Sequence, residues 1–191
     1  MIVGVSDLGR GLTIEWEGEL YLIEEYSHMK KAQRRPVAQT KLRHLRTGRI
    51  LIQNFTDTDP FKVVRLEDRP LQFLYRSGDL FYFMDQETYD QFSLNREQLR
   101  GAESYLHENL ELTGLFYQGE FIKVEPPLRV ELRVTRTEPG VRGDTVSGAE
   151  KPAVLETGLE VRVPLFIKEG DVVVVDTRTA RYLSRQESTA S

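Results

Sequence analysis

The sequence predicts an all-β protein built from three small modules. Many short runs of alternating apolar and polar residues are separated by turn signals, a spacing typical of small barrels and sandwiches. Two proline-containing breaks, at 57–60 and 125–127, divide the 191 residues into stretches 1–63, 64–127 and 128–191. Because a module of this size buries only about 60% of its unfolded surface, we expect the first two to pack together.

Most strands of the first two modules are predicted as hairpins, because apolar or alternating runs flank short turns that contain glycine. In the third module Val130, Leu132 and Val134 alternate with polar residues, which indicates a strand with one buried face. The run Val172–Val175 indicates a fully buried strand. The predicted hairpin turns are Glu17-Gly18, Thr47-Gly48, Arg76-Ser77-Gly78-Asp79 and Gln118-Gly119.

One helix is predicted in the second module. Asn95 can cap its N-terminus, with Gln98 three residues on as in a capping box, and Leu99, Ala102 and Leu106 share one face. Since Gly101 weakens a helix, we expect about two or three turns at most.

The composition excludes several classes of protein. Hydrophobic residues at 39% and charged residues at 29% are typical of a folded, soluble chain. The absence of cysteine excludes a disulfide scaffold, a thiolate metal site and a cysteine nucleophile. No apolar run approaches the roughly 20 residues that cross a bilayer, and the first residues do not resemble a signal peptide. We therefore expect a cytoplasmic protein with no membrane partner.

The modest net charge of −4 hides a cationic window between Glu25 and Asp57, where no acid occurs. Residues 64–127 are acidic by contrast, with 6 basic and 12 acidic residues. A window of this kind favours an anionic partner such as the phosphates of a nucleic acid. A solvated hairpin kept soluble by charge would give the same pattern. The cations of the window are Lys30, Lys31, Arg34, Arg35, Lys41, Arg43, Arg46 and Arg49.

Catalytic motifs are missing from the sequence. It contains no G-x-x-x-x-G-K-[ST] or G-x-G-x-x-G nucleotide loop and no G-x-S-x-G nucleophile elbow. His28, His44 and His107 are scattered, and no cysteine supports them as metal ligands. We therefore expect no catalytic residue, no metal and no cofactor. The glycine-rich stretch 139–148 is either a long ordinary loop or a place where backbone approaches a nucleic acid closely.

The third module carries a complete motif of the form K-x-A-x4-G-x2-[LIV]-x-V-P-x2-[LIV]-x2-G, and by this motif the chain resembles the bacterial elongation factor P family. Segments at 7–21, 41–48, 82–92, 139–148 and 175–185 also resemble that family, so the similarity extends over about residues 1–185. The motif residues are Lys151, Ala153, Gly158, Val161, Val163, Pro164, Ile167 and Gly170.

The resemblance implies an SH3-like (KOW-like) barrel followed by two OB-fold barrels, arranged in an L shape like a tRNA. It implies a monomeric translation elongation factor, not an enzyme. The implied partners are the ribosome, between its peptidyl-tRNA and exit sites, the peptidyl-tRNA itself, and mRNA in the exit site. Holding the peptidyl-tRNA in near-attack geometry would speed slow peptide bonds, above all at consecutive prolines.

The resemblance also implies which residues touch RNA in the first module. The tip loop that would reach the peptidyl-tRNA contains Lys30, Lys31, Gln33, Arg34 and Arg35, and phosphate contacts are expected from Lys41, Arg43 and Arg46. Where the family has a lysine or arginine at the tip, often modified, this chain has Gln33 without the flanking glycines. Three alternatives remain: Arg34 or Lys31 takes over the tip position, the protein acts unmodified, or it is a paralogue with altered stalling specificity.

In the third module the resemblance assigns an mRNA and small-subunit loop to Gly143, Asp144, Thr145 and Gly148. Near the end, Tyr182 and Arg185 match the family's Y-x-x-R, which implies RNA contacts there. A second hypothesis is a general single-stranded RNA-binding protein built from OB barrels, without ribosome specificity. The scarcity of clustered aromatic residues argues against it.

Overall fold

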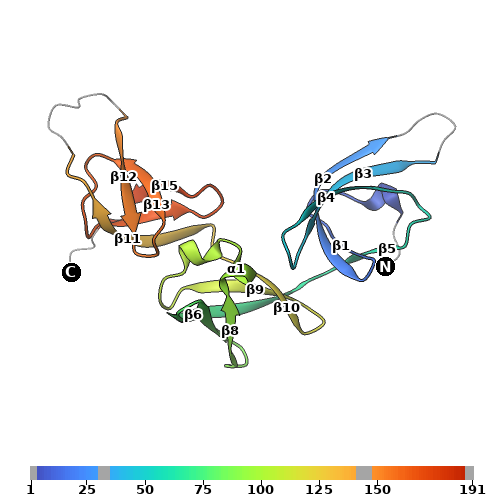
Figure 1. Ribbon diagram of the computed structural model, residues 1–191, viewed down its shortest axis with the longest axis horizontal. Coiled ribbons are helices and arrows are strands. Elements are labelled where there is room, and N and C mark those ends of the chain that lie inside the picture. Colours follow the sequence, from blue (N-terminus) through green and yellow to red (C-terminus); the bar gives the residue numbers. More distant parts are fainter. Residues whose placement is uncertain (1–3, 30–34, 141–147, 188–191) are drawn as a thin grey trace. The chain divides into compact units, whose positions relative to one another are not determined.

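Strands make up most of the chain and form three five-stranded sheets (Figure 1). The computed structural model describes residues 4–29, 35–140 and 148–187. Along the three sheets the strand orders are β4-β3-β2-β1-β5, β10-β9-β6-β7-β8 and β13-β12-β11-β14-β15. The all-β class predicted from the alternating runs is confirmed.

The strands of each sheet follow one another along the chain. The first sheet contains β1 (Thr13–Trp16), β2 (Glu19–Met29), β3 (Val37–His44), β4 (Ile50–Phe55) and β5 (Phe61–Val64). The second contains β6 (Glu67–Ser77), β7 (Leu80–Asp85), β8 (Gln91–Asn95), β9 (Glu111–Tyr117) and β10 (Glu120–Glu125). The third contains β11 (Arg129–Thr137), β12 (Glu150–Leu155), β13 (Glu160–Pro164), β14 (Val172–Asp176) and β15 (Arg181–Arg185).

Two of the predicted hairpins close with the same tight turn. Glu17 and Gly18, between β1 and β2, have φ angles of 52° and 76°, and Gln118 and Gly119, between β9 and β10, have 50° and 81°. A two-residue turn with both φ angles positive matches the twist of the flanking strands. Glycine at the second position meets this requirement without a steric cost.

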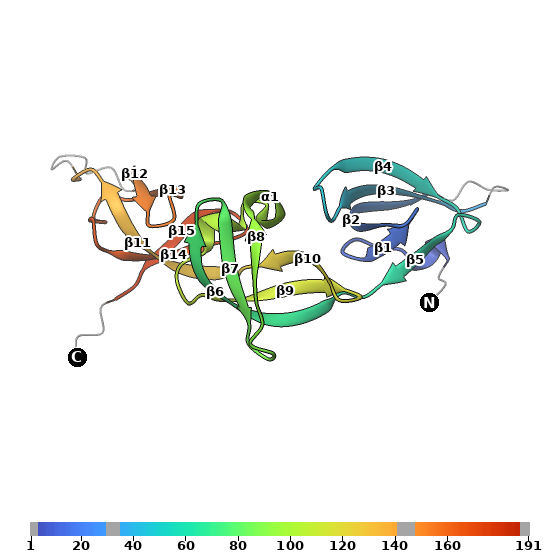
Figure 2. The same cartoon turned by 60° about the horizontal axis from the view of Figure 1, so that its bottom comes forward.

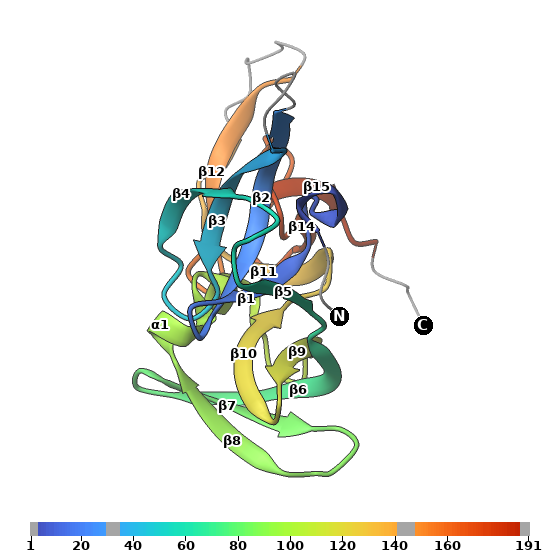
Figure 3. The same cartoon turned by 90° about the vertical axis from the view of Figure 1, so that its right-hand side faces the viewer.

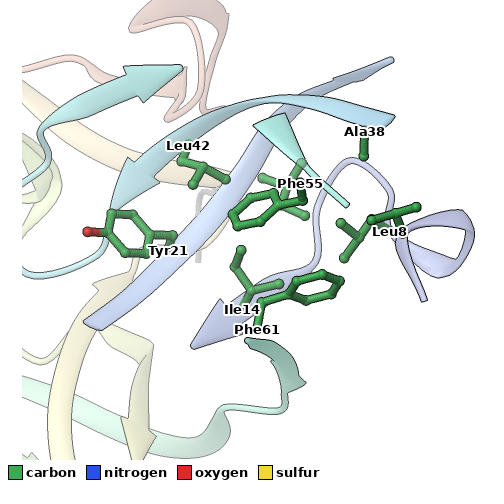
Figure 4. Close-up of a cluster of buried hydrophobic side chains, with 9 residues drawn as sticks. Leu8, Ile14, Tyr21, Ala38, Leu42, Phe55 and Phe61 are labelled. Atoms are coloured by element: carbon green, nitrogen blue, oxygen red, sulfur yellow. The ribbon is translucent and has the colours of Figure 1, made fainter. Parts of the chain in front are cut away.

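The first sheet encloses an aromatic and aliphatic core (Figure 4). Phe55, which is fully buried, lies against Phe61 at 5.2 Å and edge-on to Trp16 at 5.4 Å between ring centroids. Short helical segment η1 (Val5–Asp7) closes one end, where Asp57 Oδ1 accepts a hydrogen bond of 2.8 Å from the Val5 amide. Because side chains from all five strands meet here, the sheet curls around a single core.

The predicted helix is present and is only four residues long. Asn95 and Gln98 form the reciprocal capping box at 2.9 Å, and α1 spans only Arg96–Leu99. It ends because Arg100 and Gly101 adopt left-handed φ angles of 49° and 89°, after which the chain continues as the 3₁₀ segment η2 (Ala102–Tyr105). Its length is within the expected maximum of two or three turns, but it ends before Ala102 and Leu106, which are buried together with Leu99 as predicted.

The prediction that the strand Val172–Val175 is fully buried is wrong. In β14 only Val173 and Val175 are completely buried, while Val172 and Val174 are partly exposed. The strand lies between β11 and β15 in a sheet with one face on the core, so alternate valines face outward.

By its internal contacts the chain divides into two compact units. The first comprises Met1–Asp68 with Leu115–Lys123, and the second comprises Arg69–Gly114 with Val124–Ser191. The division into domains at 63 and 127 and the L-shaped arrangement stay predictions.

Candidate nucleic-acid interface

The hairpin β2–β3 leads to the predicted tip loop. The two strands pair continuously from Tyr21 opposite His44 to Met29 opposite Val37, and Figure 3 shows β2, β3 and β4 side by side. Residues 30–36 therefore connect the strands at the far end of the ladder. Arg35 is exposed there, whereas the predicted tip residues Lys30, Lys31, Gln33 and Arg34 lie outside the described residues.

Two of the predicted phosphate contacts face acids across this hairpin. Lys41 Nζ lies 3.1 Å from Glu25 Oε1, and the Arg43 guanidinium donates to Glu24 Oε1. A bulge brings this about: the register passes from Ile23 opposite Leu42 to Glu25 opposite Lys41, with Glu24 as the extra residue. Glu24 and Glu25, which directly precede the cationic window in sequence, therefore lie beside strand β3.

Arg46, the third predicted phosphate contact, forms a network with two acids. Its Nε and Nη2 donate to the two carboxylate oxygens of Glu120 at 3.1 and 2.8 Å, and Nη1 donates to Glu19 at 2.8 Å. The hydrogen bonds that Arg46 donates to Glu120 are the main cause that raises the pKa of its guanidinium above the ordinary value. Leu20, Leu45 and Ile122 form a further buried cluster, which joins the first sheet to strand β10.

Because Lys41, Arg43 and Arg46 are paired with acids, fewer cations of the window are unpaired than the sequence suggested. Exposed ion pairs of this kind are each worth only about 0–1 kcal/mol, so they can exchange, but their charges are neutralised at rest. In the part of the chain that the structure describes, Arg35 and Arg49 are exposed and form no salt bridge. Among the described cations of the window, those without a salt bridge therefore lie outside the paired strands, Arg35 just before β3 and Arg49 just before β4.

The hairpin β11–β12 leads to the second predicted contact segment. Of the predicted mRNA-loop residues, Gly148 is exposed with a φ of 90°, and Gly143, Asp144 and Thr145 fall outside the described residues. The root of this segment is held tightly. Lys151 is only 7% exposed, and its Nζ donates to the backbone carbonyl of Glu138.

Gly140, at the other side of that root, packs directly against the backbone of Leu165. A Cβ atom built on Gly140 would lie 2.7 Å from the Leu165 carbonyl oxygen, closer than real Cβ contacts. Thr137 Oγ1 also donates to the Pro152 carbonyl at 2.9 Å across the hairpin. Glycine is thus required here for close backbone packing, not for an unusual φ angle.

Tyr182 and Arg185 lie on the same face of β15. Residues three apart in a regular strand point to opposite faces. Here the register passes from Tyr182 opposite Val175 to Arg185 opposite Val173, so the bulge lies at Leu183 and restores a common face. Tyr182 is half-buried, and burial is the main cause that raises the pKa of its phenol. The bulge therefore brings Tyr182 and Arg185, the two predicted RNA contacts of β15, onto one face.

Sequence reasoning missed one residue of this face. The Arg185 guanidinium lies 5.2 Å from the ring centroid of Phe166, which is 55% exposed, and Nη1 lies 4.0 Å from Asp171 Oδ2. An exposed ring under an arginine can stack a nucleobase. Phe166 stands beside the buried Ile167 of the motif, and no pattern in the sequence distinguishes the exposed residue from the buried one.

Two structural findings concern other classes of site. Across residues 4–29, 35–140 and 148–187, no three histidine, aspartate or glutamate side chains gather closely enough to hold a metal ion. In the same residues no helix has both the length and the apolar character needed to span a bilayer.

Comparison with known proteins covers nearly the whole chain. Three family models match: the KOW-like domain of elongation factor P at 4–61, its OB domain at 66–124 and its C-terminal domain at 130–185. Elongation factor P of Natranaerobius thermophilus is 46% identical over 180 residues, which are 94% of this chain and 96% of that relative. The Thermodesulfovibrio yellowstonii protein of the same name is 44% identical over 184 residues, covering 96% and 98% of the two chains.

A solved structure agrees with the fold. Eukaryotic translation initiation factor 5A from Methanococcus jannaschii superposes with a TM-score of 0.54 at 21% identity, over 65% of this chain and 91% of that one. Its identity is too low to support more than the fold. The identity to the curated relatives, by contrast, extends through all three sheets. The chain belongs to the elongation factor P family of translation elongation factors.

Proposed function

We propose that this translation factor binds the ribosome between the peptidyl-tRNA and exit sites and positions the peptidyl-tRNA for peptide-bond formation at consecutive prolines. The observation that carries the proposal is the near full-length identity of 46% to an elongation factor P. The geometry supports it, since β2 and β3 pair as far as Met29 opposite Val37, the two residues between which the predicted tip segment runs in the sequence.

In this proposal the protein holds the peptidyl-tRNA in place and takes no chemical part in peptide-bond formation. The cations of segment 30–35 contact phosphates of the tRNA acceptor stem, which restricts its drift while ribosomal RNA catalyses the bond. Lys41, Arg43 and Arg46 support the hairpin through their acidic partners rather than providing the main phosphate contacts. Tyr182 and Arg185, with Phe166 beside them, contact RNA of the tRNA or small subunit, and the segment around Gly148 approaches exit-site mRNA.

Reconstituted translation of a reporter with consecutive prolines tests the tip. The Arg34→Glu/Arg35→Glu variant should lose most of the stimulation seen with the unchanged protein. A matched control, Arg65→Glu/Arg96→Glu, reverses two exposed charges in the acidic middle third and should retain it. Equal loss in both variants, or stimulation that does not depend on prolines, would contradict the proposal.

Salt dependence tests the phosphate contacts directly. If the four cations Lys30, Lys31, Arg34 and Arg35 engage phosphates, the logarithm of ribosome affinity should fall with the logarithm of salt with a slope of roughly −3 to −4. Binding to a short single-stranded RNA, measured at the same salt, distinguishes the alternative of a general RNA-binding protein. Equal affinity for free RNA and for ribosomes would favour that alternative.

We also propose that the factor acts without a modification at Gln33, because an amide side chain offers no amine for acylation. Intact-mass measurement of protein from its native cells should give the mass of the unmodified sequence, about 22.1 kDa. An additional mass located by fragmentation to residues 30–35 would refute this.

A further inference from the structure

A bulge in β6 turns one aromatic side chain from the core to the surface. The register of β6 and β7 passes from Phe73 opposite Phe83 to Tyr75 opposite Tyr82, so Leu74 is the extra residue. Phe83 is fully buried, whereas Tyr75 is 52% exposed. Bulges often re-aim a side chain next to a functional surface.

The exposed ring is part of a larger uncharged surface. Tyr75 and Tyr82 stack at 4.6 Å between centroids with 15° between their planes, and Leu80, two residues before Tyr82, is 41% exposed. The edge strand β8 lies beside β7 (Figure 2). Its residues opposite Leu80 and Tyr82 are Asn95 and Ser93, both exposed and uncharged. We call Tyr75, Leu80 and Tyr82 the tyrosine face. Contiguous apolar surface of this kind marks an interaction site.

Three acidic side chains lie in a cavity beside Tyr75. Tyr75 also lines an open cavity of about 350 Å³ with Glu103, Glu108 and Glu156. Arg76 is the cation of that lining, and its guanidinium is engaged by the Gly78 carbonyl at 2.7 Å and by the Phe81 ring. The Oε2 atom of Glu103 is buried and has no hydrogen-bond partner within the described residues. A buried carboxylate oxygen without a donor is costly, so a donor from a partner would be favourable here.

We propose that the tyrosine face docks an extended, arginine-rich segment of a partner protein. A guanidinium stacks on a tyrosine ring and also donates to carboxylates, which matches the stacked rings and the three glutamates. A nucleic acid fits less well, since its phosphates would meet those glutamates and a middle third with 6 basic and 12 acidic residues. The proposal concerns a surface separate from the tip and does not depend on how the tip acts.

Titration of the full-length protein with a short synthetic peptide of alternating glycine and arginine tests the proposal. Fluorescence anisotropy of the labelled peptide at low salt should show saturable binding. Tyr75→Ala should weaken it by about fivefold, and Glu103→Gln/Glu108→Gln should weaken it comparably. Tyr75→Phe keeps the ring and should bind as the unchanged protein does.

The control is Tyr89→Ala, which removes a tyrosine that is 72% exposed in the β7–β8 turn and should leave peptide binding unchanged. Absence of saturable binding overturns the proposal, as does equal weakening by Tyr75→Ala and Tyr89→Ala. Tighter, Tyr75-dependent binding of a labelled oligouridylate would overturn it in favour of RNA. If Tyr75→Ala does not fold, the test rests on the other two variants: unweakened binding by Glu103→Gln/Glu108→Gln, or weakened binding by Tyr75→Phe, would overturn the proposal. Because the peptide assay contains no ribosome, its result is independent of proline stalling.

Discussion

The two hairpins that lead to the predicted contact segments are stabilised in different ways. Along β2–β3 the cations Lys41 and Arg43 pair with acids at the surface, and Arg46 pairs with acids on both sides. At the root of β11–β12, Lys151 is buried against a carbonyl and Gly140 lies against backbone. Salt screens exposed charges far more than buried contacts. We therefore expect the stability of the first hairpin to depend on ionic strength more than that of the second.

The largest expected effect is at the root of β11–β12. Gly140→Ala forces a Cβ against the Leu165 carbonyl, and such overpacking should cost about 2–3 kcal/mol in the free energy of unfolding of the second unit. Hydrogen exchange of β11–β14 amides would measure it. Trp16, the one tryptophan, lies in the first sheet, so its fluorescence transition should not move. Gly9→Ala, which adds a Cβ in open space, is the control and should change stability by less than about 0.5 kcal/mol.

A somewhat smaller effect is expected for Lys151→Met. Methionine fills a similar volume but leaves the Glu138 carbonyl without its donor, which should cost about 1–2 kcal/mol by the same exchange measurement. The loss should be the same at low and high salt. Lys168→Met, at an exposed lysine of the same module, should be close to neutral. A loss for Lys151→Met that shrinks with added salt would contradict the contrast between the hairpins.

At the first hairpin Arg46→Ala should cost up to about 1 kcal/mol at low salt, because it removes an exposed ion-pair network. Trp16 fluorescence in urea is the measurement, and the difference from the unchanged protein should diminish as salt is raised. Arg49→Ala, at an exposed arginine with no salt bridge among the described residues, is the matched control. A cost that is independent of salt would indicate that packing of the arginine stem dominates.

The smallest effect concerns pH in the same unit. Tyr117 donates a 2.8 Å hydrogen bond to Glu15 Oε2, and this bond is the main cause that lowers the pKa of Glu15 below its ordinary value of 4.5. A lowered folded-state pKa contributes stability that is complete above pH 4.5 and is lost as the pH falls through the lowered value. Tyr117→Phe should therefore flatten the acid dependence of the Trp16 unfolding midpoint. Tyr89→Phe should leave that dependence unchanged.

Much of the fold could be predicted from local pattern. Glycine-containing turns and period-two alternation located the hairpins, and Asn95 with Gln98 located the helix start. The helix end and the half-exposed valines of β14 were missed, since both depend on backbone conformation and neighbours rather than on residue type. At the candidate interface Tyr182 and Arg185 were named from a motif, but Phe166 was not, because its exposure has no local signal.

The sequence by itself determined the β class, the turn positions and the family, because these follow from residue order and from long stretches of identity. Only the tertiary structure decided which charges remain unpaired. Three cations of an acid-free window of sequence are paired with acids, since antiparallel pairing places Glu24 and Glu25 beside Arg43 and Lys41, and Arg46 contacts Glu19 and Glu120. Bulges in β2, β6 and β15 likewise changed which side chains share a face. One inserted residue reverses the alternation that follows it, and the sequence does not mark where that insertion falls.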